Sequence, residues 1–153
     1  MAATFVDKLV KSFKRLMIPS INGKPTYVTI KAMHELLNSN AASVTTNLGC
    51  GKLVCLCLTL SPTVYTTLSA AWFVPPANPG AMPVIPTGTT RPKAASIRYA
   101  HNAATLAFKN FRNVDRALRQ QLLGAVEDNF VQVKHRPHQG IRSDFDNFCF
   151  EYI

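Results

Sequence analysis

The sequence predicts a mainly α-helical fold, arranged as a small helical bundle with a Pro-rich irregular loop at its centre. Three segments place apolar side chains three or four residues apart, which is the period of an amphipathic helix. No segment has a convincing alternation of apolar and polar residues, and residues 74–90 hold five of the ten prolines. Because 47% of the 153 residues are hydrophobic, the chain is expected to bury one core of ordinary size.

The first helix is expected over residues 3–17, within a basic amphipathic N-terminal segment of residues 1–18. Six apolar side chains share one face at helical spacing: Phe5, Leu9, Val10, Phe13, Leu16 and Met17. Four cations lie largely off that face: Lys8, Lys11, Lys14 and Arg15. This composition is typical of a helix that lies on an anionic membrane surface, so these four are the candidate membrane-surface residues.

Two more helices are expected before the Pro-rich loop. Residues 26–43 follow a plausible N-cap at Thr26 and present one apolar stripe, formed by Ile30, Met33, Leu37 and Ala41. His34 lies beside that stripe, a position typical of a boundary residue rather than a ligand. The segment "SPTVYTTLSAAWF" predicts a short helix in which Ser61 is the cap and Pro62 takes the first helical position.

The strongest helical pattern covers residues 91–126. Its apolar stripe steps by three or four through Ala94, Ile97, His101, Ala104, Phe108, Phe111, Val114, Leu118, Leu122 and Ala125. Asn113 is a candidate break between two helices, with Asp115 near the start of the second. A helical continuation through Phe130, Val131 and Val133 is expected to stop at Pro137.

The stretch "TTNLGCGKLVCLCLTLSPTVY" (residues 45–65) has four readings. A phosphate loop fails, because Thr46 stands where the first glycine belongs and Leu53 follows the lysine. A zinc site lacks a second pair of cysteines. A membrane span over residues 53–74 is uncharged, but it contains six Ser/Thr and a central proline. A buried segment is therefore favoured, and "KLVCLCLTL" is the one candidate strand.

The residues that could carry chemistry do not form a catalytic group. Glu127 and Asp128 are adjacent and diverge on a helix, and no serine or cysteine has a nucleophile motif. The sequence therefore predicts no enzyme, no cofactor, no metal and no small-molecule substrate. The four cysteines and the absence of an apolar secretory signal predict free thiols in a cytoplasmic protein.

Positive charge is unevenly distributed along the chain. The formal net charge is +9, and residues 91–142 carry ten Lys/Arg against three acids. Residues 1–24 carry five Lys/Arg against one Asp, whereas residues 143–153 carry three acids and no base. Basic helix faces suit a polyanion, either nucleic acid or an anionic membrane.

The ordered motifs of residues 19–140 resemble the N-terminal capsid region of Gag-like polyproteins from copia-type retrotransposons, in the version seen in diatoms and other protists. A helix ends in "NAAS" and leads through a Gly-rich turn to "LCLTLSPTVY"; a Pro-rich stretch with "NPG" follows, and then "VDRALRQQLLGAVE". Residues 52–55 depart from the family, which usually has His-Gly and another Gly there. After residue 140 the likeness fades as in a truncated member, and neither a zinc knuckle nor a protease motif follows.

The resemblance implies a capsid-like helical domain over residues 19–140, with its Pro-rich loop at 74–90, followed by a divergent acidic tail of residues 141–153. Such a domain self-associates into a homo-oligomeric shell around the element's RNA. The candidate nucleic-acid-binding residues are Arg98, Lys109, Arg112, Arg116, Arg119, Lys134 and Arg136. Phe108, Phe111 and Trp72 are candidates for stacking on bases, although their helical spacing favours the core.

Two alternatives stay open at this point. The basic N-terminal helix favours a membrane-surface protein, which flotation with anionic vesicles would reveal. The fading of the capsid likeness near residue 140 favours a degenerate open reading frame without a selected function, which would expose apolar faces and melt without cooperativity.

Overall fold

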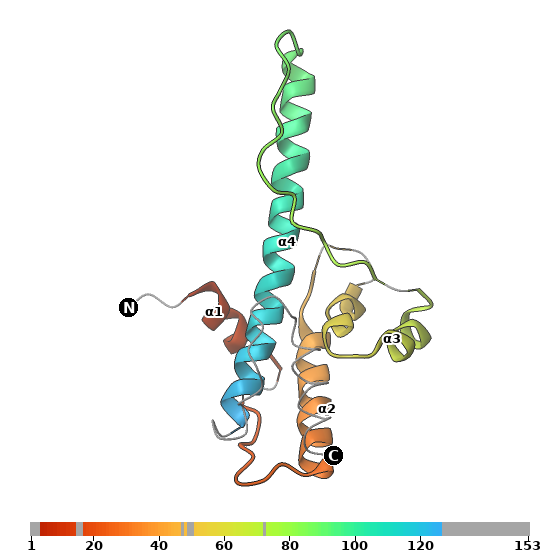
Figure 1. Cartoon of the computed structure of the whole chain (residues 1–153), viewed down its shortest axis with the longest axis vertical. Coiled ribbons are helices and arrows are strands. Elements are labelled where there is room, and N and C mark those ends of the chain that lie inside the picture. Colours follow the sequence, from red (N-terminus) through yellow and green to blue (C-terminus); the bar gives the residue numbers. More distant parts are fainter. Residues whose placement is uncertain (1–3, 15–16, 47, 49–50, 72, 127–153) are drawn as a thin grey trace. The chain divides into compact units, whose positions relative to one another are not determined.

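The computed structural model describes residues 4–14, 17–46, 48, 51–71 and 73–126, with the side chains of residues 51 and 52 excepted. In that part the chain is mainly α-helical, as predicted, and it forms no strand longer than a single bridge. The elements follow in the order α1 (Phe5–Ser12), α2 (Tyr27–Ser43), the 3₁₀ helix η1 (Gly51–Leu58), α3 (Pro62–Ser69) and α4 (Arg91–Ala125) (Figure 1).

The chain divides into two compact units. The first combines residues Met1–Phe73 with residues Asn113–Ile153, and the second is Val74–Arg112. Helix α4 contributes its first part to the second unit and its last part to the first. The first unit contains most of the buried side chains and is called the cored unit below. The second contains five Lys/Arg and no acid, and it is called the basic unit.

Helix α1 is shorter than the predicted helix over residues 3–17. Thr4 and Asp7 form a capping box, in which the Thr4 N–H donates to Asp7 Oδ2 (2.9 Å) and the Asp7 N–H donates to Thr4 Oγ1 (3.2 Å). The helix ends at Ser12 because Phe13 adopts an extended backbone (φ −65°, ψ 146°) and buries its ring. Burial of this large aromatic side chain outweighs one more turn of an exposed helix.

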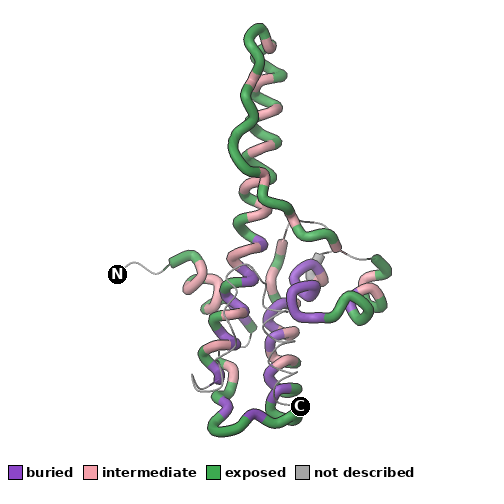
Figure 2. Tube along the Cα trace, in the orientation of Figure 1, coloured by how far each residue is buried: buried purple, intermediate pink, exposed green. Residues whose placement is uncertain are grey.

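Helix α2 agrees with its prediction. Thr26 is the N-cap, and its Oγ1 accepts from the Thr29 N–H at 3.3 Å. The predicted stripe is buried: Ile30, Met33, Leu37 and Ala41 all lie in the core (Figure 2). Asn40 is buried beside them and donates from Nδ2 to Gln121 Oε1 of α4 at 2.8 Å, which joins these two helices.

The Cys-rich segment forms the 3₁₀ helix η1 and not the candidate strand. Residues 54–60 are buried without interruption, so the segment has no solvent face to alternate with a core face. Helix η1 packs against α2 and α3, and the His34 Nε2 of α2 donates to the carbonyl of Thr59 at 2.8 Å. Helix α3 begins as predicted, with Ser61 as its cap and Pro62 in its first turn, and it buries Tyr65.

Helix α4 is a single helix of 35 residues, so the predicted break at Asn113 is wrong. Asn costs an α-helix only about 0.7 kcal/mol relative to Ala, which its neighbours easily offset. Val114, Leu118 and Leu122 are buried, and Ile21 donates its N–H to the Ala125 carbonyl at 2.7 Å beside a parallel bridge to Val126. The predicted continuation through Phe130, Val131 and Val133 lies outside the described residues.

The Pro-rich residues 74–90 form no helix or strand, as predicted. Within the basic unit they run back beside the first turns of α4 (Figure 1). Gly88 has φ +86° in the turn that precedes the helix, a backbone conformation that favours glycine. The Thr89 N–H donates to the Pro86 carbonyl at 3.2 Å and closes this turn.

Candidate nucleic-acid interface

The basic unit has an unusual charge and burial for a compact part of a protein. Residues 74–112 contain five Lys/Arg and no Asp or Glu. All 39 positions are described, and only Phe111 among them is buried. Side chains of this unit therefore meet solvent almost everywhere, and its cations have no acidic residue of the same unit as a partner.

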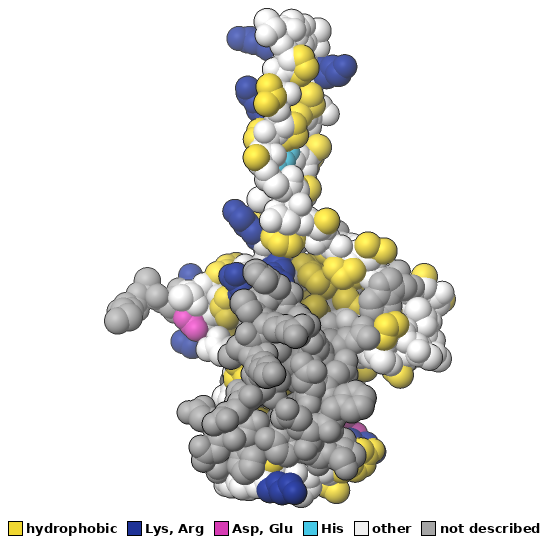
Figure 3. Space-filling model, in the orientation of Figure 1, with side chains coloured by type: hydrophobic (Ala, Val, Ile, Leu, Met, Phe, Trp, Pro, Cys, Tyr) yellow, Lys and Arg dark blue, Asp and Glu magenta, His cyan; other side chains and the backbone are white. Residues whose placement is uncertain are grey.

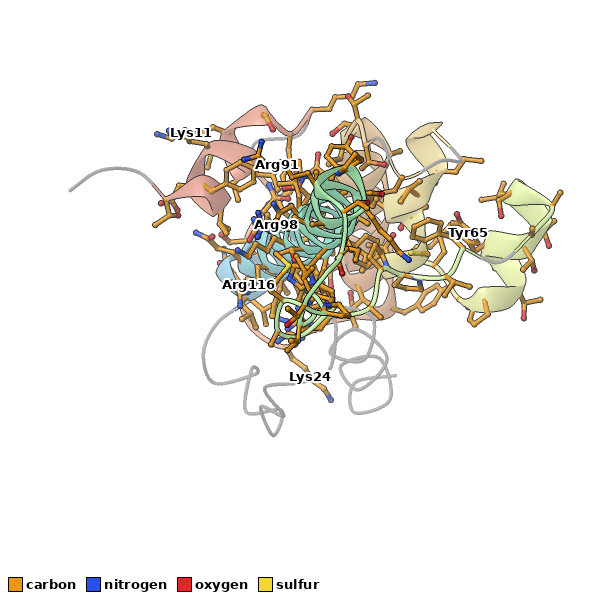
Figure 4. All side chains as sticks on the ribbon, turned by 90° about the horizontal axis from the view of Figure 1, so that it is seen from above. Lys11, Lys24, Tyr65, Arg91, Arg98 and Arg116 are labelled. Carbon is orange, nitrogen blue, oxygen red and sulfur yellow. The ribbon has the colours of Figure 1, made fainter. Side chains whose placement is uncertain are left out.

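Three of these cations share one face of α4. Arg91 and Arg98 are seven residues apart, and Lys109 follows Arg91 by 18 residues, which is about five turns of an α-helix. All three side chains are exposed, and Arg91 and Arg98 extend to the same side of the helix (Figure 4). Dark blue side chains protrude from this helical part in the space-filling view (Figure 3). Arg91, Arg98 and Lys109 are called the basic strip.

The other predicted nucleic-acid-binding residues differ in their settings. Arg112 of the basic unit is half-buried, and it takes part in an interaction. Arg116 and Arg119 belong to the cored unit, where Arg116 is exposed and Arg119 is half-buried. Lys134 and Arg136 lie outside the described residues. The structure thus brings two of the seven predicted residues, Arg98 and Lys109, together in the basic strip.

The candidate membrane-surface residues lie on or just after α1. Lys8, Lys11 and Lys14 are exposed, and Arg15 lies outside the described residues. The apolar face of α1 is partly occupied by the protein itself, because Val6, Leu9 and Val10 are half-buried. A hydrogen bond from the Thr4 hydroxyl lowers the pKa of the Asp7 carboxyl, and hydrogen bonds from the Thr4 backbone and the Gln120 side chain lower it further.

Aromatic side chains near the basic strip fall into three settings. Phe111 is buried and Phe108 is half-buried, so both serve packing, as their helical spacing favoured. Trp72 lies outside the described residues. Tyr99 is 78% exposed, and sequence reasoning missed both it and Arg91. The repeat of seven residues between Arg91 and Arg98 could have revealed the strip, whereas only a structure reveals the exposure of Tyr99.

The two described cysteines of η1 lie away from solvent. Cys55 and Cys57 are both buried, and burial raises the pKa of the Cys55 thiol to about 12, which keeps it protonated. Among the described residues, no cluster of three or more His, Cys, Asp or Glu side chains is arranged to bind a metal ion. Nor does any described helix have both the length and the hydropathy that a membrane crossing requires.

One cleft of about 310 Å³ lies where the loop of residues 18–26 meets α2. Its lining is mainly apolar, and Lys24 is the only charged residue among the described residues that line it. None of these described lining residues is an acid, a histidine or a cysteine, so together they offer no pair of groups for proton transfer or metal binding. The strongest functional signal of the described residues is therefore the exposed cationic helix.

Comparison with known proteins returns no relative: no protein-family model, no curated protein and no solved structure matches the chain.

Proposed function

We propose that this chain is a structural protein of the Gag-like type, which binds RNA without sequence preference and assembles around it. The observation that carries the proposal is the basic unit, with five cations, no acid and three exposed cations on one face of α4. Phosphate contacts of this kind position a nucleic acid without reading its bases, which suits packaging.

Electrostatics set the expected strength of this interaction. Each phosphate that a cation neutralises on a single strand contributes about 0.7 to the slope of log affinity against log salt. Three residues of the basic strip give a slope near −2, and Arg112 or Arg116 would add to it. Binding should therefore weaken steeply between low and physiological salt.

The surfaces around the cations favour an RNA partner over a membrane surface. An interfacial helix needs a free apolar face beneath its cations. In α1, Val6, Leu9 and Val10 are half-buried and the adjacent Phe13 is buried, so the protein itself covers much of this face and leaves Phe5, which is 59% exposed, as its large exposed apolar side chain. The basic strip needs no apolar face, because phosphates bind to cations that stand in solvent.

The assembly part of the proposal rests on the capsid-like order of motifs and on apolar exposure. Three large apolar side chains of the Pro-rich loop in the basic unit are exposed: Val74, Met82 and Val84. RNA that neutralises the basic unit removes the repulsion between copies, so assembly should follow binding. Light scattering with and without RNA tests this step, and a monomer that ignores RNA would contradict it.

The binding experiment measures the polarisation of a labelled RNA of 20 nucleotides against protein concentration, from low to high salt. The double variant Arg98→Gln/Lys109→Gln removes two cations of the basic strip. We expect weaker binding and a salt slope that is smaller by about 1.4. Both side chains are exposed, so the thermal melt should stay unchanged.

The matched control is Lys24→Gln/Lys31→Gln, which removes the same charge from two exposed positions of the cored unit. This control should bind RNA with nearly the slope of the parent chain. Equal losses in both double variants would mean that net charge alone drives binding and that the basic strip is no site. If instead the chain floats with anionic vesicles and ignores RNA, the membrane alternative replaces the proposal.

A further inference from the structure

We propose that the basic unit takes single-stranded nucleic acid specifically, with Tyr99 as the platform on which a base stacks. This inference rests on the proposed function and adds a substrate class and a residue to it. It starts from the exposure of Tyr99, which is 78% accessible in the middle of a unit that contains no acidic residue. A ring this open offers a π-face on which an unpaired base can stack beside the cations of the unit.

The surroundings of Tyr99 leave its ring open on the helix surface. Residues three and four positions away are its neighbours on a helix. These are Ala95, Ser96, Asn102 and Ala103, and all four are exposed and small. No long side chain of the same helix face therefore covers the ring, and a base can approach it.

The basic strip lies next to this platform. Arg98 directly precedes Tyr99, and Asn102 follows Arg98 by four residues and Tyr99 by three. Asn102 therefore neighbours both side chains on the helix surface, with an amide that can donate and accept at a base edge. A phosphate at Arg98 and a base on Tyr99 would belong to the same short piece of strand. Cations and an aromatic ring on adjoining faces of one helix are the usual components of a single-strand site.

A duplex fits this arrangement less well than a single strand does. In A-form RNA the major groove is too deep and narrow for side chains to read, and paired bases are not available for stacking on a protein ring. A duplex would engage the cations alone and leave Tyr99 in solvent. The aromatic ring thus adds affinity only for a strand whose bases are unpaired.

A second copy of this chain is a poorer occupant of the same face. Pairing two copies through this face would bring together ten cations and no acid from the two basic units. Like charges at such close range repel, and the exposed apolar side chains on this face of α4 are Pro92, Tyr99, Leu106 and alanines. A polyanion satisfies both the charge and the ring.

The test compares single strands with a duplex, using the full chain. The probes are a 20-nucleotide oligo(U), an oligo(dT) of the same length and a 20-base-pair RNA duplex. We expect Tyr99→Ala to weaken binding of the single strands at least about fivefold and to leave the duplex unchanged. Tyr99→Phe keeps the ring and should bind like the parent chain. Because stacking is not ionic, Tyr99→Ala should keep the salt slope.

The matched control is Leu106→Ala, which truncates another exposed side chain seven residues further along the same helix face. It should leave single-strand binding unchanged, because an aliphatic side chain offers no π-face. If oligo(U) and oligo(dT) bind alike, the site contacts the bases and phosphates but not the 2′-hydroxyl. If oligo(U) binds more tightly, the 2′-hydroxyl contributes as well. Either result supports a single-strand site.

The failures of the two proposals are distinguishable. A parent chain that binds no probe at low salt overturns the proposed function and this inference together. A parent chain that binds single strands and duplex equally, with no effect of Tyr99→Ala, overturns this inference alone. A loss of equal size for Leu106→Ala would assign the effect to altered packing and also overturn the role of Tyr99.

Discussion

The cored unit and the basic unit share helix α4, yet they differ in almost every physical respect. In the cored unit, α4 buries Val114, Ala117, Leu118 and Leu122, whereas the basic unit buries Phe111 alone among its described residues 74–112 (Figure 2). Charge follows the same division. Helix α4 has one acidic residue, Asp115, and it belongs to the cored unit.

This difference teaches that a continuous helical pattern can serve two purposes along one helix. Three of the five stripe residues before Phe111 are small or polar (Ala94, His101 and Ala104), and these remove little apolar area from water. The stripe after it contains leucines and valine. Stability should therefore reside in the cored unit, and the basic unit should be free to devote its side chains to a partner.

The sharpest way to break this comparison is to truncate one leucine in each unit. Leu118 is fully buried and Leu106 is 59% exposed, although both are on α4. We expect Leu118→Ala to lower the free energy of unfolding by about 2–5 kcal/mol, because it loses buried area and leaves a cavity. Leu106→Ala should change it by less than about 0.5 kcal/mol. Urea unfolding followed by circular dichroism measures both.

A broad, non-cooperative urea transition in the parent chain would support the degenerate reading frame instead. Equal effects of the two substitutions would mean that the basic unit also contributes a core, which contradicts the comparison.

The next largest effect concerns the buried amide pair of the cored unit. Asn40 Nδ2 donates to Gln121 Oε1 at 2.8 Å, and both side chains are buried. Asn40→Leu should cost about 1–3 kcal/mol, because Gln121 loses this partner inside the core. The double variant Asn40→Leu/Gln121→Leu should recover part of the loss. Asn102→Leu, in the basic unit, is the matched control and should be near neutral, since Asn102 is exposed.

If the double variant is no more stable than Asn40→Leu, the two amides contribute independently and do not act as a pair. The same thermal or urea unfolding series decides between these outcomes.

A smaller effect follows from the buried thiol of the cored unit. Burial raises the pKa of Cys55 from 9.0 to about 12, so above pH 9 the unfolded chain loses a proton that the folded chain keeps. The unfolded state then binds fewer protons, and stability falls as pH rises, by up to about 1.4 kcal/mol per pH unit between pH 9 and 12. Below pH 9 both states hold the proton, and the contribution does not change.

Unfolding of the reduced chain at pH 9 and at pH 10.5 measures this fall. Cys55→Ala lacks the thiol, so its stability should depend less steeply on pH than that of the parent chain. Identical pH slopes in the two proteins would show that the thiol ionises at its ordinary pKa, and hence that η1 admits water.

Much of this fold was predictable because local rules and packing agree. Thr26 and Ser61 were identified as caps, and the stripe from Ile30 to Ala41 was identified as core, from spacing alone. The errors occur where tertiary packing outweighs the local signal. Phe13 leaves its helix to become buried, and Asn113 continues a helix because its neighbours on either side pack.

The candidate site was less predictable than the fold. Charge counts identified Arg98 and Lys109, but they did not separate them from the half-buried Arg112 and Arg119, because burial on a long helix depends on what the rest of the chain covers. The Cys-rich segment shows the same limit, since a fully buried run has no periodicity that distinguishes a strand from η1. Tyr99 was missed because it lies off the predicted apolar stripe of residues 91–126, and its sequence position alone does not show that its ring is exposed.

The smallest expected effect also separates the two units most directly, through one backbone change in each. Gly124 of the cored unit is helical and exposed, and a Cβ added there meets no atom within 4 Å. Gly124→Ala should raise the free energy of unfolding by about 0.5–1 kcal/mol, since it removes chain entropy from the unfolded state.

The reverse change, Ala103→Gly in the basic unit, weakens the helix by a similar amount. If the basic unit opens on its own, Ala103→Gly should speed amide exchange only in that part of α4 and leave the global unfolding midpoint unchanged. A midpoint that falls as far with Ala103→Gly as it rises with Gly124→Ala would mean that α4 unfolds as one cooperative element.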